Sequence, residues 1–375
     1  MAYWIQNYVL ALALSVLITG LIIPKILLIA FRKKLFDTVD ERKIHRGIVP
    51  RLGGVAFLPA LIFSFCLVAG FNLHFHYAEI IPLTGVVTVP LFFLVCGAML
   101  IYLVGMADDL IGVRYRGKFL LQIIAAILIM ASGMWVSDLY GFLWLRSIPA
   151  WVGWIITGFC IIYVVNAVNL IDGIDGLASG LSAVALGWYS YVFCVYEEYA
   201  WMVLSGATLG TLIPFFYYNV FGNPEKQKKI FMGDTGSLTI GIMLAFLTIA
   251  VFSIPEDAVS SGSNIFIMAV SPLILPCFDV ARVFLHRVRH GRNPFLPDKC
   301  HIHHKFLALG LLQWQALVSI VAFDMLFVII NVLMSRVMQP TLIILGDVLL
   351  WVALNVLLTR IIRARERRLG KVLYD

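Results

Sequence analysis

Long apolar stretches alternate with short polar segments along the whole chain. A helix needs about twenty consecutive apolar residues to cross a bilayer, and roughly ten or eleven stretches of that kind are present. The expected spans are residues 4–31, 53–72, 86–106, 119–136, 150–168, 177–196, 200–218, 237–254, 264–285, 314–334 and 340–361. This pattern predicts an all-α, polytopic integral membrane protein with about 10–11 transmembrane helices, formed as a single domain over residues 1–375.

The basic residues between these stretches separate into two sets when the spans alternate in direction. Nearly every Lys and Arg falls in one set of loops, and only Arg146 and Arg336 clearly fall in the other. Because cytosolic loops collect Lys and Arg, we expect the N-terminus outside and the C-terminus in the cytosol. The basic tail, residues 361–375, is expected to lie against anionic lipid in the cytosol.

Composition supports a membrane protein and reduces the range of expected binding partners. Hydrophobic residues make up 61% of the chain and charged residues 13%, with a mean hydropathy of +0.95, whereas about a quarter of a soluble domain is charged. The net charge of +7 is then a signal of topology and lipid contact, so no nucleic-acid partner is expected. The cysteines show no paired spacing, which indicates neither a zinc site nor a disulfide framework.

Acidic residues and histidines gather at the expected cytosolic ends of the spans. They are Asp108, Asp109, Asp172, Asp175, Asp234, Asp279, Asp298, His45, His301, His303 and His304. Carboxylates at a membrane boundary are costly unless they are hydrated, paired or bound to a metal. Several loops that present them to one face therefore predict a shared polar site. A transporter would more often hold its acids near the bilayer midplane.

Two acidic motifs carry the most specific patterns. Asp108 and Asp109 are adjacent, and two neighbouring acids ionise together only when a cation lies between them or one stays protonated. Asn166, Asn169, Asp172 and Asp175 stand at three-residue intervals, so we expect a helical turn to align them on one face. Packing alone does not explain four polar groups in register between two apolar spans.

Two further loops suit phosphate chemistry. Asp234 lies between two glycines and is followed by hydroxyl residues, which fits a metal–phosphate site, with a plain helix cap as the alternative. The histidines at 301, 303 and 304 could bind zinc, but they lack a partner at standard zinc spacing and look more like donors to phosphate oxygens. Lys118 could neutralise a phosphate or could simply mark the cytosolic side.

The ligand chemistry favours one cation and one class of reaction. Oxygen ligands without thiolates favour Mg²⁺ over transition metals, with Mn²⁺ as an alternative. Basic residues, a divalent cation and amide-rich loops at a membrane face fit phosphoryl transfer, which depends on positioning and charge neutralisation. Residue chemistry alone identifies neither a lipid nor a sugar.

Five ordered motifs extend over nearly the whole chain. They are Arg42-Lys43-Ile44-His45 with Pro50 and Gly53-Gly54, Asp108-Asp109, the segment from Asn169 to Leu177, the segment from Phe231 to Ser237, and His301-Ile302-His303-His304. In this order they resemble the polyprenyl-phosphate N-acetylhexosamine-1-phosphate transferase family, glycosyltransferase family 4. The resemblance implies transfer from a UDP-N-acetylhexosamine to undecaprenyl phosphate with release of UMP, at the cytosolic face of a bacterial inner membrane.

The resemblance also implies roles for individual residues. Asp234 and Asn169, with Asp109 close by, would hold Mg²⁺, and Asp108 would take the proton from the lipid phosphate. Direct attack and a covalent aspartyl intermediate both stay open. Catalytic roles fall on Asp108, Asp109, Asp172 and His303, and substrate-binding roles on Lys118, Asn166, Asp175, Asn219, Phe231, Arg282, His301 and His304.

Details of the motifs select a branch of this family. The His-Ile-His-His pattern is similar to the branch that initiates O-antigen, common-antigen or teichoic-acid linkers. Gly112 stands where the peptidoglycan branch usually has a lysine, so UDP-N-acetylglucosamine is favoured over the muramoyl-pentapeptide nucleotide.

Two rival functions stay open. One is a transporter or lipid flippase, which Asp324 and Asp347 within spans suggest, and the other is a metal-dependent lipid phosphatase. A homodimer stays open.

Overall fold

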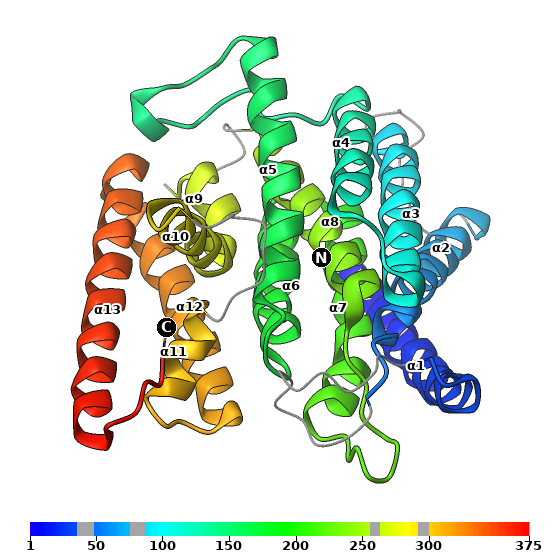
Figure 1. Ribbon diagram of the computed structural model, residues 1–375. Coiled ribbons are helices and arrows are strands. Elements are labelled where there is room, and N and C mark those ends of the chain that lie inside the picture. The colour runs from blue at the N-terminus through cyan, green and yellow to red at the C-terminus, as the bar shows by residue number, and fades with distance from the viewer. Residues whose placement is uncertain (36–48, 76–86, 256–262, 292–299, 375) are drawn as a thin grey trace.

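The computed structural model describes residues 1–35, 49–75, 87–255, 263–291 and 300–374. Its elements are α1 (Ala2–Lys33), η1 (Gly53–Ala56), α2 (Phe57–His74), α3 (Thr88–Ile111), α4 (Tyr115–Ala131), η2 (Phe142–Trp144), α5 (Ala150–Ile171), α6 (Leu177–Val195), α7 (Tyr199–Val220), α8 (Gly233–Phe252), α9 (Ile265–Val270), η4 (Ser271–Leu273), α10 (Ile274–Arg289), α11 (Ile302–Ala308), α12 (Gln313–Met334) and α13 (Pro340–Leu369). The Arg42-Lys43-Ile44-His45 motif and Asp298 lie outside the described residues. The bundle is shown in Figure 1.

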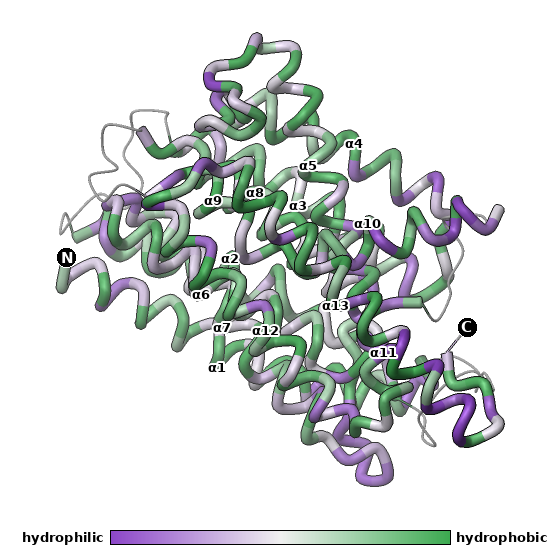
Figure 2. Tube along the Cα trace, turned by 90° about the vertical axis from the view of Figure 1, so that its left-hand side faces the viewer, coloured by the Kyte–Doolittle hydropathy of each residue, from purple (hydrophilic) through white to green (hydrophobic). Residues whose placement is uncertain are grey.

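The all-α membrane architecture predicted from the sequence is confirmed. Among the described residues, ten helices are long and apolar enough to cross a membrane. Figure 2 shows hydrophilic residues at helix ends and connecting turns, while the middle of most helices is hydrophobic. The protein is therefore a multi-pass membrane protein.

Two of the expected spans differ from the prediction. The stretch 119–136 gives the 17-residue helix α4, which stops at Ala131 because the chain turns at Ser132 and Gly133, the latter with a φ of 95°. At 1.5 Å per residue, α4 is about 26 Å long, slightly less than a hydrocarbon core of about 30 Å. The stretch 264–285 is interrupted by η4, where Pro272 lies, and continues as α10.

Helix α8 lies at the centre of the bundle. Every residue in its most apolar 18-residue window is buried, and α3, α5, α6 and α7 all contact it. Small residues permit this close packing. A Cβ added at Gly241 would lie 2.8 Å from the Cα of Val165 in α5, and one at Gly105 would lie 2.6 Å from the Cα of Thr235. Glycines therefore bring the neighbouring backbones up to α8.

The tightest of these approaches joins η1 to the start of α8. A Cβ added at Gly54 would lie 2.0 Å from the backbone nitrogen of Gly236. The backbone N–H of Gly54 also donates to the carbonyl of Met232 at 2.9 Å. The Gly53-Gly54 motif thus sets the distance between the second span and the central helix.

We predict that Gly54→Ala destabilises the protein by about 1–3 kcal/mol, because the new methyl group meets backbone rather than a movable side chain. The matched control is Gly70→Ala in α2, where an added Cβ meets nothing within 4 Å. The measurement is the thermal unfolding midpoint of both variants in detergent. Equal midpoints for the two variants would contradict the close approach.

Candidate active site

The end of α3 caps the start of α8. The two oxygens of Asp109 accept hydrogen bonds from the backbone N–H groups of Asp234 and Thr235, both at 2.8 Å, and from the Thr235 hydroxyl at 2.6 Å. A carboxylate is stabilised at a helix N-terminus, where N–H groups have no partner within the helix. The cap therefore comes from another helix, and Asp109 fixes where Asp234 lies.

Lys118 joins two of the predicted site carboxylates. Its ammonium nitrogen lies 3.1 Å from Asp108 Oδ2 and 2.7 Å from Asp234 Oδ2. The other oxygen of Asp108 accepts the backbone N–H of Val113 at 2.7 Å. The chain reverses between α3 and α4 at Gly112, with a φ of 72°. A cation does lie between two acids, but it pairs Asp108 with Asp234 and not with its neighbour Asp109.

The four polar residues at three-residue intervals do not share a helical face, so that expectation is wrong. Helix α5 ends at Ile171, and Asp172 and Asp175 follow it in a turn. Asn169 donates from Nδ2 to Ser237 Oγ at 2.8 Å, whereas Asn166 donates to Gln122 Oε1 at 2.7 Å. Asn169 therefore reaches the start of α8, and Asn166 lies one turn deeper, against α4.

The turn after α5 is held by residues of two other loops. Asp175 forms a largely buried ion pair with Lys229, with a nitrogen–oxygen distance of 2.6 Å. The side-chain oxygen of buried Asn219 accepts the backbone N–H of Gly176 at 2.6 Å, and its Nδ2 donates to the carbonyl of Ile230 at 2.9 Å. Asn219 thus braces both loops, and its predicted contact with the nucleotide stays a prediction.

The loop that carries Phe231 is fixed through its backbone. The N–H of Phe231 donates to the carbonyl of Pro50 at 2.8 Å, and its own carbonyl accepts the N–H of Gly53 at 2.9 Å. The Pro50 to Gly54 motif and the loop before α8 therefore form one unit. The side chain of Phe231 is half-buried, and its predicted substrate contact also stays a prediction.

His303 lies against the turn that follows α5. A Cβ added at Gly173 would lie 2.3 Å from His303 Nε2, so the third and fifth motifs are in contact. The imidazole is 1% exposed, and neither ring nitrogen has a hydrogen-bond partner among the described residues. Burial, and then the neighbouring His304, lower its pKa to about 3. A neutral imidazole with unpartnered nitrogens could accept or donate one hydrogen bond to a bound group.

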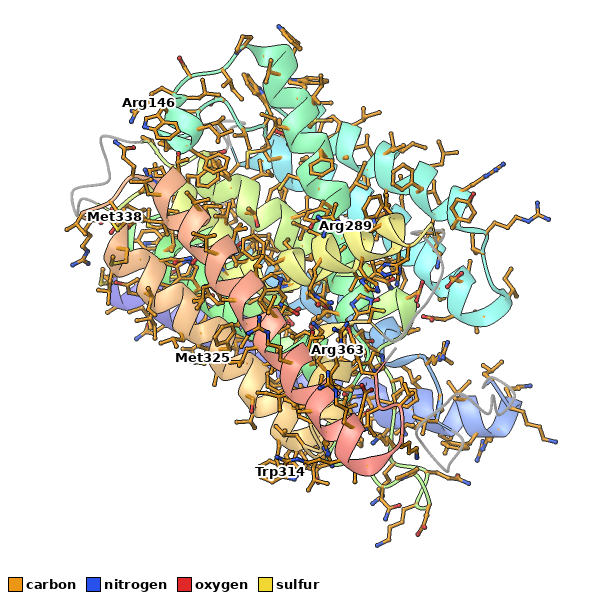
Figure 3. The ribbon with its side chains drawn as sticks, turned by 60° about the vertical axis from the view of Figure 1, so that its left-hand side comes forward. Arg146, Arg289, Trp314, Met325, Met338 and Arg363 are labelled. Carbon is orange, nitrogen blue, oxygen red and sulfur yellow. The ribbon has the colours of Figure 1, made fainter. Side chains whose placement is uncertain are left out.

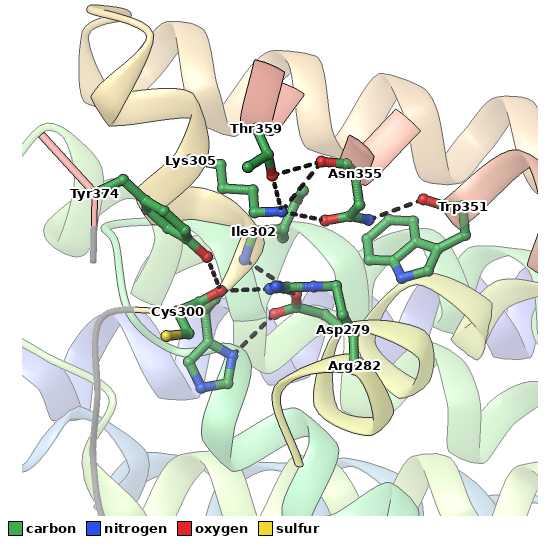
Figure 4. A network of polar contacts seen from close by, with 10 residues as sticks. Asp279, Arg282, Cys300, Ile302, Lys305, Trp351, Asn355, Thr359 and Tyr374 are labelled. Carbon is green, nitrogen blue, oxygen red and sulfur yellow. Dashed lines mark hydrogen bonds and ion pairs between the residues drawn. The ribbon is translucent and has the colours of Figure 1, made fainter. Parts of the chain in front are cut away.

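Asp279 of α10 organises the start of the histidine motif (Figure 4). Its carboxylate accepts hydrogen bonds from His301 Nδ1 at 2.9 Å, the backbone N–H of Ile302 at 3.0 Å and Arg282 Nη2 at 2.8 Å. Arg282 also donates to the carbonyl of Cys300. His301 and Arg282, both predicted to bind substrate, thus bind Asp279 in the structure, and their contact with a substrate stays a prediction.

The C-terminal segment also reaches this motif. The hydroxyl of Tyr374 donates to the carbonyl of Cys300 at 2.7 Å. Buried Lys305 donates to Asn355 Oδ1 at 2.9 Å and to Thr359 Oγ1 at 3.1 Å in α13. Burial, and then the charge of Arg282, lower the pKa of Lys305 to about 8. The tail was expected only to lie against lipid; here it also supports the histidine motif.

Sequence reasoning missed the roles of Asp279, Lys305 and Tyr374. Asp279 was one of the acids at span ends but had no assigned partner. Lys305 directly follows His304 at an expected membrane boundary. A lysine there is normally explained by the excess of basic residues in cytosolic loops. For Tyr374, no local pattern points to Cys300, 74 residues away. Only the folded arrangement of α10, α11 and α13 brings these groups together.

Asp108 and Asp234 could contribute to a site for a cation that takes few ligands from the protein. Among the residues that the structure describes, no group of three or more His, Cys, Asp or Glu side chains could hold a metal ion. Mg²⁺, however, commonly uses one or two carboxylates and completes its shell with water and phosphate oxygens. Asp108 and Asp234 are only partly exposed and share one ammonium, so they form a locus of negative charge suited to a cation.

Asp172 lies among several carboxylates. Desolvation by the surrounding protein, and then the charges of Asp175, Asp234 and Asp109, raise its pKa to about 7. The side chain itself is open to solvent, so the nearby like charges are the firmer cause. A carboxyl group that changes charge near neutral pH is thus placed beside the other site residues.

Comparisons with known proteins match part of this chain to a family and most of it to several relatives. The sequence model described as glycosyl transferase family 4 matches residues 91–252. A Bacillus subtilis (strain 168) protein named "Probable undecaprenyl-phosphate N-acetylglucosaminyl 1-phosphate transferase" is 29% identical over 323 residues, 85% of this chain and 82% of that protein. Proteins named "Undecaprenyl-phosphate alpha-N-acetylglucosaminyl 1-phosphate transferase" are 27% identical in Yersinia pestis, over 82% of this chain and 79% of the relative, and in Escherichia coli (strain K12), over 81% and 78%.

The raised pKa of Asp172 predicts a pH-dependent effect of Asp172→Asn on stability. The protonated carboxyl favours folding below the unfolded pKa of 3.8, and this advantage is lost as pH rises through the folded pKa of about 7. The thermal midpoint of the variant minus that of the wild type should therefore grow between about pH 4 and pH 7 and stay constant above. The exposed Glu225→Gln serves as control; a difference that does not vary with pH would contradict the prediction.

Proposed function

Since residues 91–252 carry a glycosyl transferase family 4 domain, we propose that the chain transfers N-acetylglucosamine 1-phosphate from UDP-N-acetylglucosamine to undecaprenyl phosphate and releases UMP. The observation that carries the proposal is the meeting of Asp108, Lys118 and Asp234 at one end of the helix bundle. These residues come from three different helices within the matched domain. The relatives named above act on the same lipid according to their names.

The side chains of the site would share the work of positioning and neutralisation. Asp234 and Asn169 would hold Mg²⁺, with Mn²⁺ as an alternative, and the ion would neutralise the diphosphate. Asp108, which its bond to Lys118 favours in the charged form, would accept the proton of the lipid phosphate. The lipid phosphate oxygen then bonds to the sugar-linked phosphorus, the bond from this phosphorus to the bridging oxygen breaks, and UMP leaves with that oxygen.

We place the site at the cytosolic face of a bacterial inner membrane. The end of α3 that carries Asp108 and Asp109 is followed by Arg114, Arg116 and Lys118, and the start of α8 that carries Asp234 is preceded by Lys226, Lys228 and Lys229. Cytosolic loops collect Lys and Arg. The orientation of the two termini depends on α4. If α4 crosses the membrane beside α3 and α5, which both contact it, the N-terminus lies outside and the C-terminus in the cytosol.

The rival functions have less support. Gly112, which stands where the peptidoglycan branch usually has a lysine, adopts a φ of 72°, and this conformation strains any residue other than glycine. Asp347, one of the two acids that suggested a transporter, accepts a hydrogen bond from Asn331 at 2.8 Å. Asp324 is fully buried and has no hydrogen-bond partner in the part of the chain that the structure describes.

The proposed reaction predicts UMP release that needs both the lipid and the divalent cation. The purified protein is mixed with UDP-N-acetylglucosamine and undecaprenyl phosphate, with and without Mg²⁺, and UMP is measured. Release only when both are present is the expected result. If UMP is released from the muramoyl-pentapeptide nucleotide but not from UDP-N-acetylglucosamine, the chain belongs with the peptidoglycan branch. If inorganic phosphate is liberated from the lipid when no nucleotide sugar is present, the protein is a phosphatase.

Asp234→Ala should lower this UMP release by about 100-fold or more, because it removes a group proposed to hold the cation and not a packing contact. The bonds that cap α8 use the backbone of Asp234 and Thr235, so the fold should persist. The thermal midpoint of the variant provides the control for folding. A folded variant with full activity would show that Asp234 is not part of the site.

A further inference from the structure

A polar cavity lies at the end of the bundle opposite the candidate active site. It has a volume of about 510 Å³ and is lined in part by Tyr140, Trp144, Arg146, Arg336 and Gln339. It lies between the segment that joins α4 to α5 and the turn that joins α12 to α13. The 22 residues of α5 separate it by about 33 Å from the turn that carries Asp172. Figure 3 shows Arg146 and Met338 near one edge of the molecule, away from Arg289 and Arg363.

Two arginines that are far apart in sequence converge on this cavity. Arg146 and Arg336 both line it, and they are the two basic residues that clearly fall on this side of the membrane in the sequence. None of the described residues that line the cavity is acidic. Arg146 Nε lies 3.9 Å from Asp138 Oδ2, and 55% of the Arg146 side chain is exposed. The lining therefore carries positive charge suited to a phosphate.

The wall of the cavity is a constrained hairpin. Tyr140, Leu143 and Trp144 have φ values of 49°, 54° and 59°, in the left-handed region. Such backbone persists only where surrounding contacts enforce it. Here the N–H of Leu143 donates to Thr341 Oγ1 at 2.7 Å, and Asn264 Nδ2 donates to the carbonyl of Tyr140 at 2.7 Å. The hairpin is thus tied to the start of α13 and to the segment before α9, and the cavity is already formed.

Exposed apolar side chains line the cavity or flank its lining residues in the chain. Trp144 and Val337 line it and are 69% and 79% exposed, and Leu143 and Leu145, on either side of Trp144, are 53% and 49% exposed. Tryptophan is enriched where a membrane meets water, because its ring is apolar and its N–H is polar. Two guanidinium groups that line one cavity together with exposed apolar side chains match an amphiphile that has an anionic head and hydrocarbon chains. A soluble anion would contact the arginines but not these apolar side chains.

We propose that this cavity binds an anionic phospholipid from the leaflet opposite the candidate active site. Arg146 and Arg336 hold its phosphate, and its acyl chains lie along Leu143, Trp144 and Val337. The site takes no part in the proposed transfer reaction. It links the hairpin to the turn between α12 and α13, so a bound lipid stabilises the folded protein by mass action.

The test measures thermal unfolding of the full chain in neutral detergent while phosphatidylglycerol is added. The wild type should show a saturable rise of the midpoint, and phosphatidylcholine should give a much smaller one. In Arg146→Gln/Arg336→Gln, half-saturation should need roughly tenfold more phosphatidylglycerol or more, because two charge-assisted contacts are lost. The matched control is Lys226→Gln/Lys228→Gln, which removes two exposed positive charges from the loop before α8 and should behave as the wild type.

Several results would overturn the proposal. Equal responses of the two double variants would mean that the lipid acts elsewhere, and equal responses to both phospholipids would remove the role of charge. A full response to inorganic phosphate alone, or a stronger one to a polyprenyl phosphate, would identify a different ligand. Should the glutamine variant not fold, Arg146→Lys/Arg336→Lys keeps the charge and should retain lipid binding, and its failure to do so would count against the site. UMP release is a separate measurement, so the proposed reaction is tested independently.

Discussion

The hydrogen bonds between Asp109 and the first residues of α8 determine where the other parts of the site can lie. They join the end of one span to the start of the central helix, at a point where backbone N–H groups would otherwise have no partner. These bonds set the position of Asp234, and also that of Ser237, whose hydroxyl accepts the hydrogen bond from Asn169. The loop before α8 is bonded in turn to the Gly53-Gly54 motif. Four motifs are thus positioned by one helix terminus.

The helices were largely predictable, because the length of an apolar stretch and its charged ends depend on the membrane itself. The departures have local causes. Helix α4 stops at a turn made by Gly133, and the ninth span is interrupted near Pro272. The alignment of Asp172 and Asp175 with Asn169 was wrong, because α5 ends at Ile171 and Asp172 already has a non-helical ψ of 59°. A three-residue interval predicts a shared face only where the helix continues.

Partners across the bundle were less predictable than the residues themselves. The acids and histidines of the site were identifiable from their types and positions, yet nothing in the sequence indicates that Lys118 lies between Asp108 and Asp234. The same holds for Asp279 with His301 and for Tyr374 with the carbonyl of Cys300. These pairs depend on how the helices pack. From the charge pattern by itself, Lys118 is explained equally well as one of the basic residues that mark the cytosolic side.

The central place of α8 has a consequence for how the protein is made. Ribosomes deliver a chain from its N-terminus. Of the helices that make most contacts with α8, namely α3, α5, α6, α7 and α9, only α9 follows it in the chain. When α8 leaves the ribosome, the surrounding helices are already available in the membrane to receive it. Its first five residues include Asp234, Thr235 and Ser237, which are costly to leave in lipid. Asp109 and Asn169, which bind Thr235 and Ser237 in the folded protein, have by then been synthesised. The order of the motifs along the chain therefore suits the order of their insertion.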